Sequence, residues 1–192
     1  MASEIILVRH GQTWLNAEGR LAGRLDAELT ELGRSQAAAV AAAVLAMATP
    51  ARVVTSPLHR ARQTAAAFGG TAAVDDRWVE LDYGEYDGRP LGDVPASLWE
   101  AWRADVAFAP PGGESLLALG ERVRAACEEL AAADGPTVVV SHVSPIKAAV
   151  AWALGVDDSV SWRMYLAPAS ITVIGAGERG PSLRAFNVTA HL

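Results

Sequence analysis

A short apolar run that ends on a cation and a histidine constrains this chain most. Every residue from Ile5 to Val8 is aliphatic, which is typical of a strand buried on both faces of a parallel sheet. Arg9, His10 and Gly11 follow at once, and glycine allows the backbone to turn there. In open α/β sheets, ligands bind at the carboxyl ends of the strands. The stretch therefore predicts a buried strand that places Arg9 and His10 at a binding edge.

The same arrangement recurs twice. The segment 53–56 leads into a helix start that carries Arg60, and the run 138–141 ends on His142. A single histidine at a strand end would most simply be a structural residue, but the repetition argues against that interpretation. Three buried strands would bring Arg9, His10, Arg60 and His142 to one edge of a sheet. Because cations that converge on one edge suit an anion, a phosphate is the simplest ligand.

Strand and helix patterns alternate along most of the chain, which indicates an α/β protein with a largely parallel sheet. Strands are expected at 52–55, 71–74, 137–141, 171–174 and 183–188, and helices at 30–48, 57–68, 98–106, 114–130 and 145–154. Thr30 is expected to cap the first of these helices, in which Val40, Val44 and Met47 should face the sheet. Ser56-Pro57 and Ser144-Pro145 each predict a capping serine followed by a first-turn proline. A turn at 178–180 would join the last two strands.

Composition narrows the class of protein. The chain has 192 residues, which favours one domain over residues 1–192. The net charge of −6 argues against a nucleic-acid-binding surface. The longest apolar stretch, residues 37–48, is too short to span a bilayer, and the first strand begins without a signal peptide. We therefore expect a cytoplasmic protein that binds neither membrane nor nucleic acid. The single cysteine, Cys127, is expected to lie in the core.

Six ordered motifs carry a family resemblance. They are Arg9-His10-Gly11-Gln12-Thr13 with Asn16; Leu29-Thr30 with Gly33; Ser56-Pro57-Leu58-His59-Arg60-Ala61 with Thr64-Ala65; Glu80 with Gly84 and Gly88; Gly112-Gly113-Glu114-Ser115; and Ser141-His142. In this set the sequence resembles the histidine phosphatase superfamily, on its phosphoglycerate-mutase-like branch. The resemblance implies a three-layer αβα sandwich with a mostly parallel central sheet, a single histidine phosphatase domain, and an enzyme that needs neither metal nor cofactor.

The resemblance also implies roles for residues. His10 would accept the phosphoryl group, Arg9, Arg60 and His142 would hold the phosphate oxygens, Asn16 would be a further phosphate contact, and Glu80 would be the general acid and base. A neutral imidazole is a good nucleophile if one nitrogen is bare and the other has a fixed acceptor. The Gly11 carbonyl is the nearest acceptor in the sequence.

The implied activity is hydrolysis of small phosphate monoesters through phosphohistidine. A cofactor-dependent phosphoglycerate mutase is the alternative, and a non-catalytic protein that binds phosphorylated ligands is a remote one. Many relatives have glycine at the position of Val143 and glutamine at that of Ala22, which affects the expected substrate rather than the chemistry. The segment Ser141–Lys147 most resembles phosphatases of the α-ribazole-phosphatase and acid-phosphatase type.

Several assignments have competitors. Glu80 could pair with Arg77 or Arg62 on the surface, and Asp82 could be the acid instead. Two histidines and a carboxylate could bind zinc, although Arg9 and Arg60 beside them would repel a cation. The sequence leaves open the physiological substrate, whether the chain forms a homodimer, and whether Ala104–Gly113 is a lid.

Overall fold

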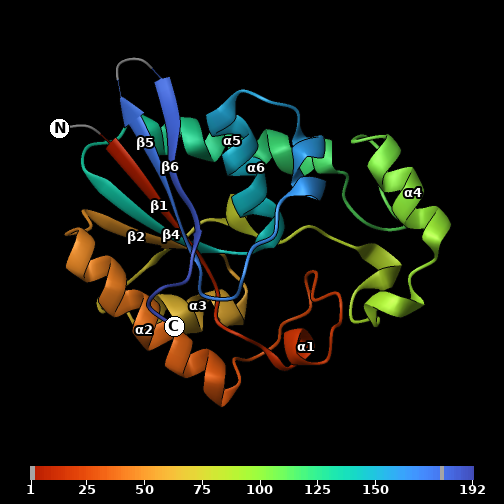
Figure 1. Cartoon of the computed structure of the whole chain (residues 1–192), viewed down its shortest axis with the longest axis horizontal. Coiled ribbons are helices and arrows are strands. Elements are labelled where there is room, and N and C mark those ends of the chain that lie inside the picture. The colour runs from red at the N-terminus through yellow and green to blue at the C-terminus, as the bar shows by residue number, and fades with distance from the viewer. Residues whose placement is uncertain (1–2, 178–179) are drawn as a thin grey trace.

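The computed structural model describes residues 3–177 and 180–192, and this part contains a six-stranded sheet (Figure 1). The strands are β1 (Ser3–Arg9), β2 (Arg52–Thr55), β3 (Ala73–Val74), β4 (Pro136–Ser141), β5 (Ile171–Gly177) and β6 (Gly180–Val188). Their order is β3-β2-β4-β1-β5-β6. The first four strands of that order run parallel, β5 is antiparallel to β1, and β6 is antiparallel to β5. The mostly parallel sheet is thus confirmed. Of the turn expected at 178–180, residues 178 and 179 lie outside the described residues.

Helices cover both faces of the sheet, as Figure 1 shows, so the predicted three layers are confirmed. On one face lie α2 (Glu31–Met47) and α3 (His59–Ala66), and on the other α5 (Leu116–Ala131) and α6 (Val143–Leu154). Alternate residues of β1 face opposite layers: Ile6 clusters with Val40 of α2, whereas Ile5 clusters with Ile146 of α6. The expectation for Met47 was wrong, because this residue at the end of α2 is 61% exposed.

Short elements connect these layers. They are α1 (Trp14–Ala17), α4 (Ala96–Ala104) and the 3₁₀ helices η1 (Asp76–Trp78), η2 (Gly84–Tyr86), η3 (Leu91–Asp93) and η4 (Asp158–Arg163). Helix α4 begins two residues before the expected start at Leu98 and is anchored by Trp102, which is fully buried. Within the described residues, no helix is long and apolar enough to cross a membrane.

The structure shows which of the predicted helix caps are present. The Thr30 side chain accepts from the Gly33 amide at 3.0 Å, so its predicted cap is confirmed. The predictions for Ser56 and Ser144 were wrong in position: α3 begins after Leu58, and α6 begins directly after His142. The hydroxyl of Ser56 lies 2.7 Å from His142 Nε2, and the amide of Ser144 donates to Glu80. Both serines therefore take part in the candidate site described next.

Candidate active site

The carboxyl ends of β1, β2 and β4 lie next to one another, because β4 is hydrogen-bonded between the other two strands. Arg9 is the register partner of Ser141, so the residues that follow each strand, His10 and His142, are also adjacent. Their ring centroids are 5.1 Å apart. The convergence expected from the repeated strand ends is present in the structure.

The ring of His10 is held in one tautomer. Its Nδ1 lies 2.7 Å from the Gly11 carbonyl oxygen, the acceptor expected from the sequence. Because a carbonyl only accepts, Nδ1 carries the proton and Nε2 has the lone pair. Arg60 Nε donates to that Nε2 at 3.2 Å. Burial lowers the pKa of His10 well below its usual value, with Arg60 and Arg9 adding to the effect. At neutral pH the imidazole is therefore neutral, with a nucleophilic nitrogen facing Arg60.

Arg60 and Arg9 are buried cations. Arg60 has no exposed surface and donates to the carbonyls of Gly23 and Leu25 at 2.7 Å each. Arg9 donates to the Leu166 carbonyl at 2.6 Å. Burial lowers the pKa of Arg9 to about 10 and also lowers that of Arg60. Within the described residues, no carboxylate forms a salt bridge with either guanidinium. The site therefore carries an excess of positive charge, which favours binding of an anion.

His142 is a fully buried residue that lies next to His10. Its Nε2 contacts the Ser56 hydroxyl, whereas its Nδ1 is buried and has no hydrogen-bond partner among the described residues. Burial lowers the pKa of His142 well below its usual value, and Arg60 adds to the effect. A neutral ring with one unpartnered nitrogen can bind a further oxygen atom once a ligand is present.

Glu80 is the buried carboxylate of the candidate site. Its carboxylate accepts hydrogen bonds from the amides of Leu81 (2.8 Å), Ser144 (3.1 Å) and Val143 (3.2 Å). It therefore satisfies two of the free amides at the start of α6, where a negative charge is favoured. The alternative of an ion pair with Arg77 is wrong, because Arg77 pairs with Asp75 and Glu129.

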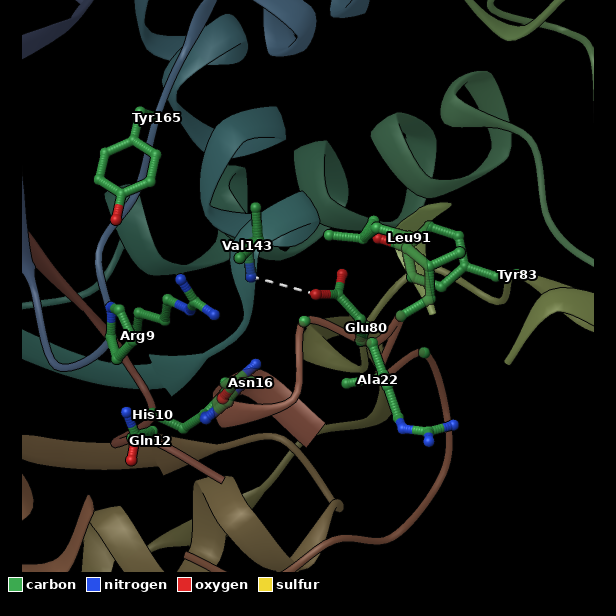
Figure 2. A pocket seen from close by; sticks show the side chains of 15 residues that line it. Arg9, His10, Gln12, Asn16, Ala22, Glu80, Tyr83, Leu91, Val143 and Tyr165 are labelled. Carbon is green, nitrogen blue, oxygen red and sulfur yellow. Dashed lines mark hydrogen bonds between the residues drawn. The ribbon is translucent and has the colours of Figure 1, made fainter. Parts of the chain in front are cut away.

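A pocket of about 500 Å³ lies between these groups (Figure 2). Arg9 and Glu80 stand on opposite sides in this view, and the side chain of Asn16 points between them. His10 also lines the pocket, whereas Arg60 and His142 do not, and both are fully buried beside it. The remaining walls are mostly apolar or aromatic: Leu21, Ala22, Tyr83, Leu91, Val143, Tyr165 and Pro168.

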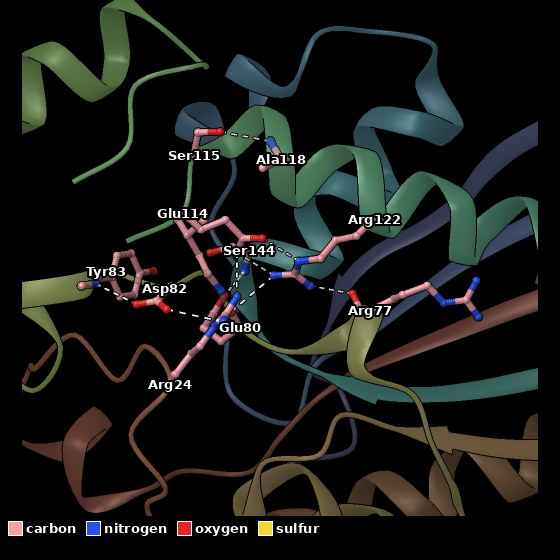
Figure 3. A network of polar contacts seen from close by, with 12 residues as sticks. Arg24, Arg77, Glu80, Asp82, Tyr83, Glu114, Ser115, Ala118, Arg122 and Ser144 are labelled. Atoms are coloured by element: carbon pink, nitrogen blue, oxygen red, sulfur yellow. Dashed lines mark hydrogen bonds and ion pairs between the residues drawn. The ribbon is translucent and has the colours of Figure 1, made fainter. Parts of the chain in front are cut away.

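A polar network fixes the Glu80 backbone from behind (Figure 3). Arg122 donates to the Glu80 carbonyl at 3.4 Å and binds the carboxylate of Glu114 at 2.8 and 2.9 Å. Arg24 donates to the same carbonyl at 3.5 Å and pairs with Glu114 and Asp82. Asp82 is thus engaged with Arg24 and does not line the pocket. The site roles of Arg24, Arg122 and the pocket residue Arg20 were not predictable from the motifs, because each of these residues lies outside them.

Potential metal ligands do not gather in this site. No group of three or more His, Cys, Asp or Glu side chains arranged to hold a metal ion occurs within the described residues. The two buried arginines beside the histidines would also repel a cation. The arrangement of donors is suited to an anionic ligand.

The sequence matches the histidine phosphatase superfamily (branch 1) over residues 5–189. The chain belongs to this superfamily. Its first curated relatives include a mycobacterial protein called bifunctional, from Mycobacterium tuberculosis, with 36% identity over 200 residues. That alignment takes in 99% of this chain but 55% of the relative, so the chain spans about half the length of these relatives.

Shorter relatives are covered more completely. A glucosyl-3-phosphoglycerate phosphatase of Mycolicibacterium vanbaalenii is 38% identical, over 79% of this chain and 74% of its own length. A probable phosphoglycerate mutase of Yersinia pestis is 32% identical, over 98% of this chain and 94% of its own length. Among solved structures, a mycobacterial glucosyl-3-phosphoglycerate phosphatase complexed with VO3 superposes with a TM-score of 0.88 at 33% identity, over 98% of this chain and 100% of that one.

Proposed function

We propose that this protein is a phosphatase that hydrolyses small phosphate monoesters through a phosphohistidine on His10. The observation that carries the proposal is the state of His10, whose Nδ1 donates to a carbonyl and whose unprotonated Nε2 accepts from the buried Arg60 at 3.2 Å. A nucleophile directly beside a fixed cation suits attack on a dianionic phosphate. The phosphatase names among the relatives support the same activity.

The reaction would proceed in two displacements. His10 Nε2 attacks phosphorus while the bond to the ester oxygen breaks, and Glu80, which must carry a proton when the substrate is bound, gives that proton to the departing oxygen. Arg9, Arg60 and His142 hold the phosphoryl oxygens, with Asn16 as a further contact. Water then gives a proton to Glu80 and attacks phosphorus, so that the P–N bond breaks and inorganic phosphate leaves. The protein returns to its starting state after each cycle.

A cofactor-dependent phosphoglycerate mutase remains the alternative, since it shares these residues. A mutase must hold a bisphosphorylated intermediate, which needs cations beyond the first phosphate site. The arginines that line the pocket are Arg9 and Arg20, and Arg20 is paired with Glu18 at 2.8 Å. The mostly apolar walls favour a substrate with a single phosphate and a less charged body.

The test is release of phosphate combined with trapping of the intermediate. The wild-type protein should release inorganic phosphate from several monoesters without added metal or bisphosphoglycerate. Acid-labile phosphate trapped on the protein should map to His10. His10→Asn should abolish turnover, whereas His59→Asn should retain it, because His59 is an exposed residue of α3.

Two outcomes would contradict the proposal. Phosphate trapped on a serine or an aspartate would exclude His10 as the nucleophile. Rapid interconversion of 3-phosphoglycerate and 2-phosphoglycerate, primed by the bisphosphate and with little free phosphate, would favour the mutase.

A further inference from the structure

A second, smaller chamber adjoins the active-site pocket. It has a volume of about 200 Å³ and shares four wall residues with the pocket: Leu21, Tyr83, Leu91 and Val143. A cavity of about 150 Å³ is enough to hold a benzene ring. The chamber is therefore large enough for one ring-sized group attached to a phosphate bound at His10.

Apolar and aromatic side chains form most of its inner wall. Trp99 and Trp162 stand edge to face with their ring centroids 6.1 Å apart, and Leu81 and Leu116 complete the surface. Such walls favour an apolar or aromatic group over a heavily hydrated one.

Lys147 is the single cation among the residues that line this chamber, and it is the only lysine of the chain. Its ammonium group donates to the Ser161 carbonyl at 2.9 Å. No salt bridge joins it to a carboxylate within the described residues. Burial lowers the pKa of Lys147, and the charge of Glu80 offsets this effect only in part. An ammonium has three donors, so further acceptors can bind beside Ser161.

The position of Lys147 on α6 sets its relation to the reacting groups. It follows Val143 by four residues, so the two lie on the same side of the helix, about 6 Å apart along its axis. The Val143 amide binds the carboxylate of Glu80, the residue placed beside the departing oxygen. A group that extends from that oxygen along α6 would therefore reach Lys147 after roughly one ring.

We propose that this chamber, here called the Lys147 chamber, binds the alcohol part of the substrate, and that Lys147 pairs with a carboxylate on an otherwise apolar, ring-sized group. The inference rests on the phosphatase activity proposed above and adds the class of substrate. The ammonium, whose hydrogen-bond partner is the neutral carbonyl of Ser161, selects a carboxylate over a neutral group of the same shape, and the tryptophan walls select the ring. The preferred substrates are thus phosphate monoesters of ring-bearing hydroxy acids.

The test uses two aryl phosphates that differ in one charge: 4-carboxyphenyl phosphate and 4-carbamoylphenyl phosphate. Wild-type kcat/KM should favour the carboxylate by about tenfold or more, the size expected for one charge-assisted hydrogen bond. In Lys147→Met this preference should disappear, mainly through a higher KM for the carboxylate. Lys147→Arg should recover part of it. The ratio of the two substrates is measured within one variant, so it does not depend on the fraction of folded protein.

Arg103→Met is the matched control. Arg103 lies over the Trp162 ring, 5.7 Å from its centroid, but does not line the chamber. Its removal changes the same charge in the same region and should leave the preference intact. A wild-type ratio near one, or a preference that survives in Lys147→Met, would overturn the inference. Failure of the wild-type protein to hydrolyse either ester would instead count against the phosphatase itself.

Discussion

Replacing Glu80 by glutamine separates its chemical role from its structural one. The Glu80 carboxylate accepts hydrogen bonds from three backbone amides, and the residue is only 5% exposed to solvent. A glutamine side chain has one acceptor oxygen, so its amide group must face at least one of the Val143 and Ser144 amides. A buried amide left without an acceptor costs about 1–3 kcal/mol. Loss of the charge at the start of α6 adds about 0.3–1 kcal/mol.

The free energy of unfolding of Glu80→Gln should therefore fall by about 1.3–4 kcal/mol, which lowers Tm by roughly 3–16 °C for a chain of this size. The effect on rate depends on the leaving group. Loss of a general acid should reduce kcat by about 10²- to 10⁴-fold for alkyl phosphates. For 4-nitrophenyl phosphate, whose leaving group needs no proton, the loss should be much smaller.

The assay is steady-state release of phosphate from both classes of ester, at a temperature below the Tm of each variant. Glu114→Gln is the control, because it neutralises the carboxylate that binds Arg122 and Arg24 behind the Glu80 backbone. It should lower stability without changing the ratio between the two esters. Equal losses on alkyl and aryl phosphates in Glu80→Gln would refute the assignment of Glu80 as the leaving-group acid.

Two further predictions concern stability. Burial lowers the pKa of both His10 and His142, so below about pH 6.5 the unfolded chain binds more protons than the folded one, and the free energy of unfolding should fall as pH decreases. Urea titrations from pH 7.5 to 5 should show this slope. An undiminished slope in the doubly substituted His10→Asn, His142→Asn protein would contradict the prediction. In Gly33→Ala the new Cβ would overlap the Gln12 carbonyl oxygen, whereas a Cβ added at Gly92 would meet no atom within 4 Å. Thermal unfolding should therefore show a loss of about 1–3 kcal/mol for Gly33→Ala and little change for Gly92→Ala.

Local patterns were enough to predict the sheet and the strand-end residues. The run 138–140 is apolar at every position, which is typical of a strand buried on both faces, and the residues that follow such a strand lie at the sheet edge. The Gly11 carbonyl was also predictable from a local pattern, because Gly11 directly follows His10, whose ring it holds.

Contacts between distant segments were not predictable. Ser56 has the sequence context of a helix cap, but its hydroxyl lies against His142, 86 residues further along the chain. The helix that was expected to begin at Pro145 begins at Val143, whose amide donates a hydrogen bond to the carboxylate of Glu80, 63 residues away in the chain. Sequence spacing describes local competition for hydrogen bonds, but it does not reveal an acceptor supplied by another part of the fold.

The two buried arginines explain why this site should be selective for a dianion. Arg9 and Arg60 are held by main-chain carbonyls, which fix their geometry without neutralising their charge. Glu80, which lines the same pocket, accepts hydrogen bonds from three backbone amides. An arginine paired with a carboxylate would have to lose that partner before it could bind phosphate, and the exchange would cancel much of the gain. Here the guanidinium groups are buried and oriented in advance, so a bound phosphate supplies the missing negative charge. The same groups remain in place to stabilise the charge that is spread over the equatorial oxygens while the phosphoryl group is transferred to His10.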